Sequence, residues 1–98
     1  MSLPVVLRDE AQAEFDEAFD YYETQRAGRS VDFGHVCRTY SIASLRTPEF
    51  HATVLSDVRK TVVSRFPYCV YYRADAARVE IIAVFHTSRD PSIWQARR

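Results

Sequence analysis

The sequence predicts one α+β domain, spanning residues 1–98, whose elements follow the order β-α-α-β-β-β. Its first half repeats apolar residues at the three- and four-residue spacing of amphipathic helices. Its second half holds three short runs that are rich in β-branched and aromatic residues. The 98 residues are 47% hydrophobic and 27% charged, which is enough apolar material for one modest core.

A short strand and a long helix are predicted at the N-terminus. The strand is Pro4-Val5-Val6-Leu7, and Asp9 follows as the expected N-cap, with Gln12 completing a capping-box pattern. The helix should cover residues 10–25. Its apolar face should carry Ala11, Phe15, Ala18, Phe19 and Tyr22. Acidic residues fill the intervening positions, so the opposite face of this helix should be acidic.

A second helix is predicted after a break at residues 27–29, where Gly28 is suited to a helix C-cap. Ser30 is its expected cap, and the 3–4 spacing continues through Phe33, Val36, Cys37 and Tyr40. The segment before Pro48 should end it, since the residue before a proline avoids helical angles. The short connection predicts an antiparallel helical hairpin.

The second half predicts an antiparallel meander over residues 58–66, 68–73 and 78–85. With the N-terminal strand it forms a mostly antiparallel four-stranded sheet. The helical hairpin should pack on one face of that sheet, because each layer has an apolar side to bury. The other face would stay open and carry basic residues. Pro91 can begin a last turn of helix.

The charges balance over the whole chain but are unevenly distributed along it. Residues 1–57 carry ten acids and five arginines, whereas residues 58–98 carry three acids and eight lysines or arginines. An anionic partner should therefore meet the C-terminal half. The apolar run at residues 81–85 is far too short for a membrane span, and the start lacks a signal-peptide pattern. We therefore expect a cytoplasmic protein that does not enter a membrane.

Cysteines and histidines give no support for a metal or cofactor site. Cys37 and Cys69 match no metal-ligand spacing, and His35, His51 and His86 are scattered along the chain. In a reducing compartment both cysteines are expected to be packing residues. The sequence also lacks a nucleophile elbow and a glycine-rich phosphate loop.

Two arginines in the first strand of the meander are candidate phosphate ligands. Period-2 alternation places Arg59, Thr61, Val63 and Arg65 on one face of that strand. On a face away from the helices, the two arginines could clamp a phosphate bidentately. They could instead protect an exposed strand edge by their charge, which is a common arrangement.

Alternation in the next strand places Tyr68, Val70 and Tyr72 on one face and Cys69, Tyr71 and Arg73 on the other. An exposed tyrosine can stack on a nucleic-acid base, whereas a buried one packs in the core with its hydroxyl hydrogen-bonded.

The end of the last strand offers a second candidate pair. His86 ends the strand, and Arg89 follows three residues later. Histidine titrates near neutral pH, so the pair could act as proton donor and anion stabiliser in phosphodiester cleavage. A structural histidine beside a solvated arginine fits the same pattern. The residues alone predict only a two-layer domain with a basic sheet face.

Two motifs resemble the signature of the RelE/ParE superfamily, the toxins of type II toxin–antitoxin systems. Residues 59–68 match a strand of the form R-x-x-x-x-x-R-F-P-Y, which runs into V-x-Y-R at residues 70–73. Residues 84–91 match V-x-H-x-x-R-D-P, with Trp94 just beyond. The start, residues 7–11, leads into an acidic helix that is also similar to the family. The resemblance covers nearly the whole chain.

The resemblance implies a growth-inhibiting toxin that needs no cofactor and is neutralised in a hetero-oligomer with an antitoxin encoded beside it. Some members cleave mRNA in the ribosomal A site, whereas others poison DNA gyrase without being nucleases. The cleaving branch commonly has an arginine where this chain has Cys69, and it tends to be strongly basic. Both departures favour a ParE-like gyrase inhibitor, with a RelE-like ribosome-dependent endoribonuclease as the alternative.

For the endoribonuclease alternative, the resemblance implies roles for five residues. His86 or Tyr72 would transfer protons, and Arg59, Arg65 and Arg89 would stabilise the phosphate. In-line attack by a ribose 2′-hydroxyl would need no metal ion.

Overall fold

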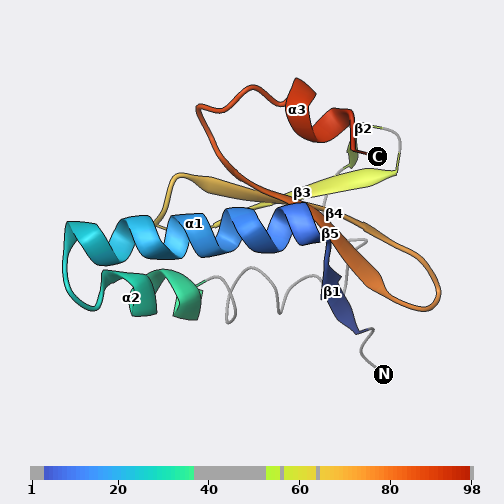
Figure 1. Ribbon diagram of the computed structural model, residues 1–98. Helices are drawn as coiled ribbons and strands as arrows, with labels where there is room; N and C mark the ends of the chain where they lie inside the picture. The colour runs from blue at the N-terminus through green and yellow to red at the C-terminus, as the bar shows by residue number, and fades with distance from the viewer. Residues whose placement is uncertain (1–3, 37–52, 56, 64, 98) are drawn as a thin grey trace.

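The computed structural model describes residues 4–36, 53–55, 57–63 and 65–97 (Figure 1). The elements, in chain order, are β1 (Val5–Leu7), α1 (Asp9–Gln25), α2 (Arg29–Val36), β2 (Thr53–Leu55), β3 (Val58–Val62), β4 (Tyr68–Ala74), β5 (Val79–His86) and α3 (Ser92–Gln95). The predicted α+β class is confirmed, with α1 and α2 packed on one face of the sheet. No described helix is long and apolar enough to cross a membrane.

The sheet has the strand order β1-β5-β4-β3-β2, in which β1 runs parallel to β5 and the other neighbours are antiparallel. It therefore contains one strand more than predicted. The additional strand, β2, is three residues long and pairs with β3. Such a short strand carries too little alternation to stand out in a sequence.

The pairing of β4 with β5 contains a bulge that explains the apolar run in β5. Tyr71 lies opposite Ala83 and Tyr72 lies opposite Ile81, so Ile82 is the extra residue. Residues 81–85 are all buried, because the sheet is covered on both faces at this point.

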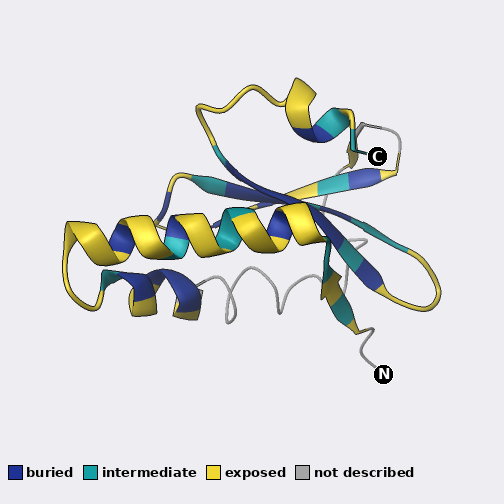
Figure 2. Ribbon diagram, viewed as in Figure 1, coloured by how far each residue is buried: buried dark blue, intermediate teal, exposed yellow. Residues whose placement is uncertain are grey.

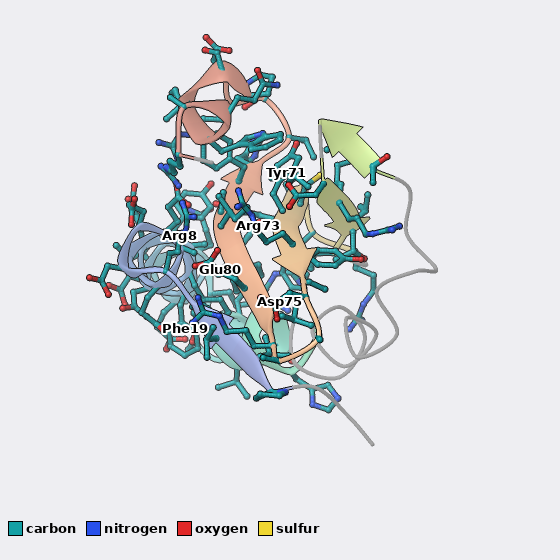
Figure 3. The ribbon with its side chains drawn as sticks, turned by 90° about the vertical axis from the view of Figure 1, so that its right-hand side faces the viewer. Arg8, Phe19, Tyr71, Arg73, Asp75 and Glu80 are labelled. Atoms are coloured by element: carbon teal, nitrogen blue, oxygen red, sulfur yellow. The ribbon has the colours of Figure 1, made fainter. Side chains whose placement is uncertain are left out.

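Helix α1 begins at Asp9, and Arg8 occupies the N-cap position without a side-chain cap. The prediction of Asp9 as N-cap is therefore wrong, and Gln12 donates instead to Asp16 at 3.0 Å. The sheet fixes the start of the helix. The Arg8 amide donates to the Ile81 carbonyl at 3.0 Å, and its guanidinium pairs with Glu80 at 3.3 Å (Figure 3).

The turn between α1 and α2 depends on Gly28, whose φ of 86° lies in the left-handed region. Helix α2 begins at Arg29, so Ser30 lies inside it and is not its cap. The buried Ser30 hydroxyl donates to the Glu23 carboxylate of α1 at 2.7 Å, which also accepts the Gly28 amide at 3.2 Å. The predicted continuation of this helix toward Pro48 lies outside the described residues.

The main core lies between the helices and the sheet (Figure 2). Its buried members are Ala11, Ala18, Tyr22, Phe33, Val63, Phe66, Val70, Tyr72, Val79, Ile81 and Val84. Tyr22 joins the layers, because its ring lies 5.1 Å from that of Phe33 and 4.9 Å from that of Phe66. Tyr68, Val70 and Tyr72 share one face, as predicted, and this face meets the helices.

A second, smaller core covers part of the face that was expected to be open. Trp94 of α3 is 1% exposed and stacks on Tyr71, with ring centroids 4.3 Å apart. Val58, Ile82, Ala83 and Phe85 complete this cluster. The expectation of a wholly open face was wrong, because the large ring of Trp94 buries itself there. In Figure 1, α3 lies on the opposite side of the sheet from α1.

Cys69 is a buried free thiol, as expected of a packing residue, and its burial raises the pKa of the thiol. Cys37 lies outside the described residues. Among the described residues, no three histidine, cysteine or acidic side chains gather closely enough to hold a metal ion.

Candidate functional site

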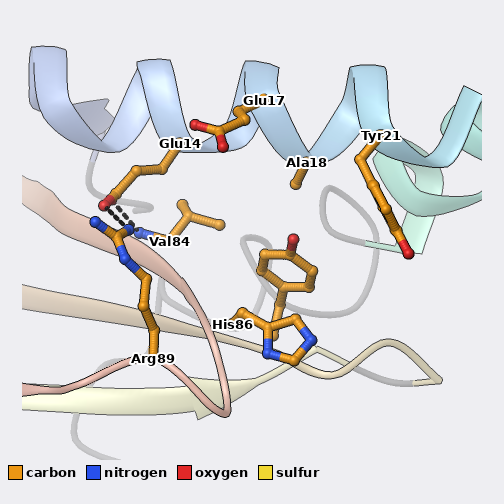
Figure 4. Close-up of a pocket in the computed structure, with 8 residues that line it drawn as sticks. Glu14, Glu17, Ala18, Tyr21, Val84, His86 and Arg89 are labelled. Atoms are coloured by element: carbon orange, nitrogen blue, oxygen red, sulfur yellow. Dashed lines mark hydrogen bonds and ion pairs between the residues drawn. The ribbon is translucent and has the colours of Figure 1, made fainter. Parts of the chain in front are cut away.

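An open cleft with a volume of about 400 Å³ lies between α1 and the C-terminal end of β5 (Figure 4). Its lining comes from α1, β4, β5 and the segment that follows β5. The lining residues are Glu14, Glu17, Ala18, Tyr21, Tyr68, Val84, His86 and Arg89. This volume is of the order that binding pockets have, about 300–1,000 Å³.

The cleft exists because β5 extends further than its neighbour β1. The pairing with β1 covers residues 79–81 only, whereas β5 continues to His86. Beyond that point the edge of β5 faces side chains instead of a strand. The Val84 amide donates to the Glu14 carboxylate at 3.1 Å, and Arg97 donates to the Ile82 carbonyl at 3.5 Å. Backbone groups that lack a strand partner are thereby satisfied.

Glu14 connects three parts of the chain. Besides the Val84 amide, its carboxylate accepts hydrogen bonds from Arg89 at 2.6 Å and from Arg97 at 2.9 and 3.0 Å. Its side chain is only 10% exposed. A nearly buried charge of this kind requires paired and hydrogen-bonded partners. The hydrogen bond to Glu14 also raises the pKa of Arg97 above its ordinary value.

Arg89 is held from two sides. Its guanidinium pairs with Glu14 and lies 4.1 Å from the ring centroid of Phe85, within the range of a cation–π contact. Arg97 lies 5.3 Å from the same ring. The Arg89 side chain nevertheless remains 42% exposed. It is therefore both a structural contact and an accessible cation at the edge of the cleft.

His86 and Tyr68 form the floor of the cleft from adjacent strands. The two rings meet edge to face with centroids 5.2 Å apart. The Ser88 amide donates to Nδ1 of His86 at 3.1 Å, so Nδ1 acts as an acceptor and the neutral ring carries its proton on Nε2. Burial raises the pKa of Tyr68, and the charge of Glu17 raises it further. Tyr68 is therefore a neutral hydroxyl at physiological pH.

Of the five residues proposed from the sequence, the structure brings only His86 and Arg89 together in the cleft. Tyr72 is 0% exposed in the main core, where its hydroxyl has no open path to a substrate. Arg59 lies opposite Tyr72 and shares its helix-facing side of the sheet, which corrects the expected placement away from the helices.

Arg65 does not share the strand face of Arg59. Strand β3 ends at Val62, and Arg65 lies in the following turn with a φ of 69°. The strand predicted over residues 58–66 is therefore too long. A left-handed residue breaks the alternation, and Pro67 has no amide hydrogen to donate to a neighbouring strand.

Sequence reasoning missed the acidic residues of the cleft. Glu14 follows Ala11 by three residues and precedes Ala18 by four, so it occupies the apolar face of α1. A carboxylate at such a position needs a buried partner, and this was a usable signal. Arg97 carried no comparable signal, because tertiary packing alone brings it to Glu14 of α1 and to Ile82 of β5.

No protein-family model matches the sequence, and no curated protein matches it either. Among solved structures, it is similar to a chain of the chromosomal ParDE TA system from P. aeruginosa, with a TM-score of 0.72 and 16% sequence identity. The match covers 87% of this chain and 96% of that chain. At this identity the likeness is one of fold. The fold that the resemblance to the RelE/ParE superfamily implied is thereby confirmed.

Proposed function

We propose that this chain is the toxin of a type II toxin–antitoxin pair and that it inhibits bacterial growth. The main support is the match to a chain of a ParDE TA system over 87% of this chain and 96% of that one. A fold alone hosts many functions, so the sequence motifs at residues 59–73 and 84–91 add necessary weight.

We favour inhibition of DNA gyrase over RNA cleavage as its action. Cleavage requires proton-transfer groups and phosphate ligands around a single phosphate. The residues proposed for that role do not converge, because Tyr72 is enclosed and Arg59 lies on β3, separated from β5 by β4. The cation of Arg89 at the cleft is already paired with Glu14.

One observation favours the endoribonuclease alternative. His86 and Arg89 line the same cleft, and a histidine with an arginine nearby is a plausible acid and anion-binding pair. The negative charge of Glu17, which has no ion-pair partner among the described residues, opposes a phosphate there.

An antitoxin partner fits the exposed apolar side chains of the helical hairpin. Tyr21 is 53% exposed and Val31 is 66% exposed. A helix or added strand of the antitoxin lying across the hairpin and the sheet would cover them. A complex that contacts only the acidic face of α1 would contradict this placement.

Two assays on the purified chain separate the two actions. We expect inhibition of supercoiling by gyrase in the first assay and unaffected translation in a cell extract in the second. Codon-phased mRNA cleavage with untouched supercoiling would reverse this ranking.

A further inference from the structure

We propose that the cleft between α1 and β5 binds an arginine side chain that the partner polypeptide inserts beside Glu17 (Figure 4). The identification of that polypeptide as the antitoxin rests on the proposed function. The preference of the cleft for a guanidinium group rests only on the charges and rings that line it.

The charges of the cleft leave the carboxylate of Glu17 unpaired. Of the three charged side chains in the lining, Glu14 pairs with Arg89 at 2.6 Å and also, outside the lining, with Arg97 at 2.9 Å. Glu17 has no ion-pair partner among the described residues. The charge of Glu17 is felt in the cleft, since it contributes to the raised pKa of the Tyr68 hydroxyl. A cation is therefore attracted to this position, whereas an anion would be repelled by Glu17.

The aromatic lining favours guanidinium over a compact ammonium group. Tyr21 and Tyr68 both line the cleft, and Tyr21 is 53% exposed. Figure 4 shows Glu17, Ala18 and Tyr21 projecting from α1 toward the side on which His86 lies. A planar guanidinium can lie on an aromatic ring and still form two hydrogen bonds with a carboxylate, which an ammonium cannot do.

The surroundings indicate that the arginine comes from a polypeptide. The exposed side of α1 also carries Asp9, Glu10, Asp16 and Asp20, so the negative charge of this helix extends beyond the cleft. A surface of one sign accelerates the approach of a chain of the opposite sign and sets its register. The cleft is open to solvent between α1 and the end of β5, so a side chain can enter it without displacing a strand.

A titration with short peptides tests the preference of the cleft. The probe is acetyl-Gly-Arg-Gly-amide, and its control replaces the arginine with citrulline, which has the same shape without the charge. We expect the arginine peptide to shift the backbone NMR signals of Ala18, Val84 and His86, and the citrulline peptide to leave them unchanged. Equal shifts with both peptides would overturn the proposal.

Two variants test the role of Glu17. Glu17→Gln should lower the affinity for the arginine peptide about three- to fivefold, as expected for loss of one partly exposed ion pair. Asp20→Asn removes a charge from the same helix outside the cleft and should weaken it less than about twofold. Equal effects of both substitutions would show that α1 attracts cations only through its overall charge, and the cleft assignment would fail.

The same two variants identify the source of the arginine. The complex with the protein encoded beside this chain should lose affinity in Glu17→Gln by the same factor and should be nearly unchanged in Asp20→Asn. Unchanged affinity in Glu17→Gln would refute the insertion of a partner side chain. If the neighbouring protein forms no complex at all, the proposed function fails, while the peptide titration still decides the chemistry of the cleft.

Discussion

At the scale of single residues, Glu14 determines how the tail and the helices meet. It lies on the apolar face of α1, is 10% exposed, and accepts from the Val84 amide and two arginines. Without Arg89 and Arg97, this nearly buried carboxylate would have no counter-charge. The cleft therefore depends on a charge network whose centre was not among the residues proposed from the sequence.

Glu14→Gln should lower the free energy of unfolding by about 1–3 kcal/mol, because Arg89 and Arg97 lose their shared counter-charge. Urea denaturation measures the change. Asp20→Asn, an exposed change on the same helix, should stay within about 0.5 kcal/mol. Equal stability of Glu14→Gln and the unmodified chain would refute the structural role of Glu14.

Arg89 and Arg97 form a matched pair for separating function from stability. Their side chains are 42% and 15% exposed, and both pair with Glu14. Arg97→Ala should therefore cost about 1–2 kcal/mol of stability, and Arg89→Ala less than about 1 kcal/mol. If the accessible cation of Arg89 contacts the target, toxicity should fall more in Arg89→Ala despite its smaller effect on stability.

Thermal unfolding and a growth assay on both variants check whether the variant with the smaller loss of stability shows the larger loss of toxicity. Toxicity that follows the melting temperature in both variants, or that survives intact in Arg89→Ala, would assign Arg89 a structural role only.

At the scale of elements, the turn of the helical hairpin requires a left-handed backbone conformation at Gly28, where the sequence predicted the break. Gly28 was the expected break, and its φ of 86° confirms a conformation that other residues rarely adopt. The helix bounds around it were less predictable. Neither Asp9 nor Ser30 caps a helix, because contacts with Glu80 and Glu23 decide where α1 and α2 begin.

The two glycines of the hairpin should respond to alanine in opposite directions. Gly28→Ala should destabilise the chain by about 1–2 kcal/mol, because a side chain is strained at this φ although the space is empty. Gly34→Ala should stabilise it by about 0.5–1 kcal/mol, since Gly34 is helical and its added carbon would lie 3.5 Å from the Phe19 ring. Shifts of the denaturation midpoint in the same direction for both variants would contradict this account.

The hairpin should also lose stability in acid through Glu23. The hydrogen bond from Ser30 and that from the Gly28 amide lower the pKa of Glu23. A lowered folded-state pKa gives stability that is complete above the ordinary glutamate pKa and is lost as pH falls through the lowered value. Urea midpoints should therefore fall less steeply with acidification in Glu23→Gln than in Asp20→Asn. Parallel pH profiles for the two variants would contradict this contribution.

At the scale of the whole molecule, the layers were predictable and the composition of the site was only partly so. The patterns predicted two helices on one face of a sheet and a shared strand face for Tyr68, Val70 and Tyr72, because burial of apolar faces dictates such packing; the structure shows that this is the face that meets the helices. The last turn of helix was predicted at Pro91 and is present as α3, with Pro91 at its N-cap. Its position was not predictable, since the burial of Trp94 against Tyr71 depends on contacts distant in the sequence. His86 and Arg89 were found because they are close in sequence, whereas Arg59 and Arg65 required knowledge of strand register and of one left-handed turn.

Growth of bacteria that express this chain tests the proposed function most directly. We expect arrest when the chain is expressed alone and recovery when the protein encoded beside it is expressed as well, since the fold matches a chain of a ParDE TA system with a TM-score of 0.72. Normal growth at a verified level of soluble chain would contradict the assignment as a toxin.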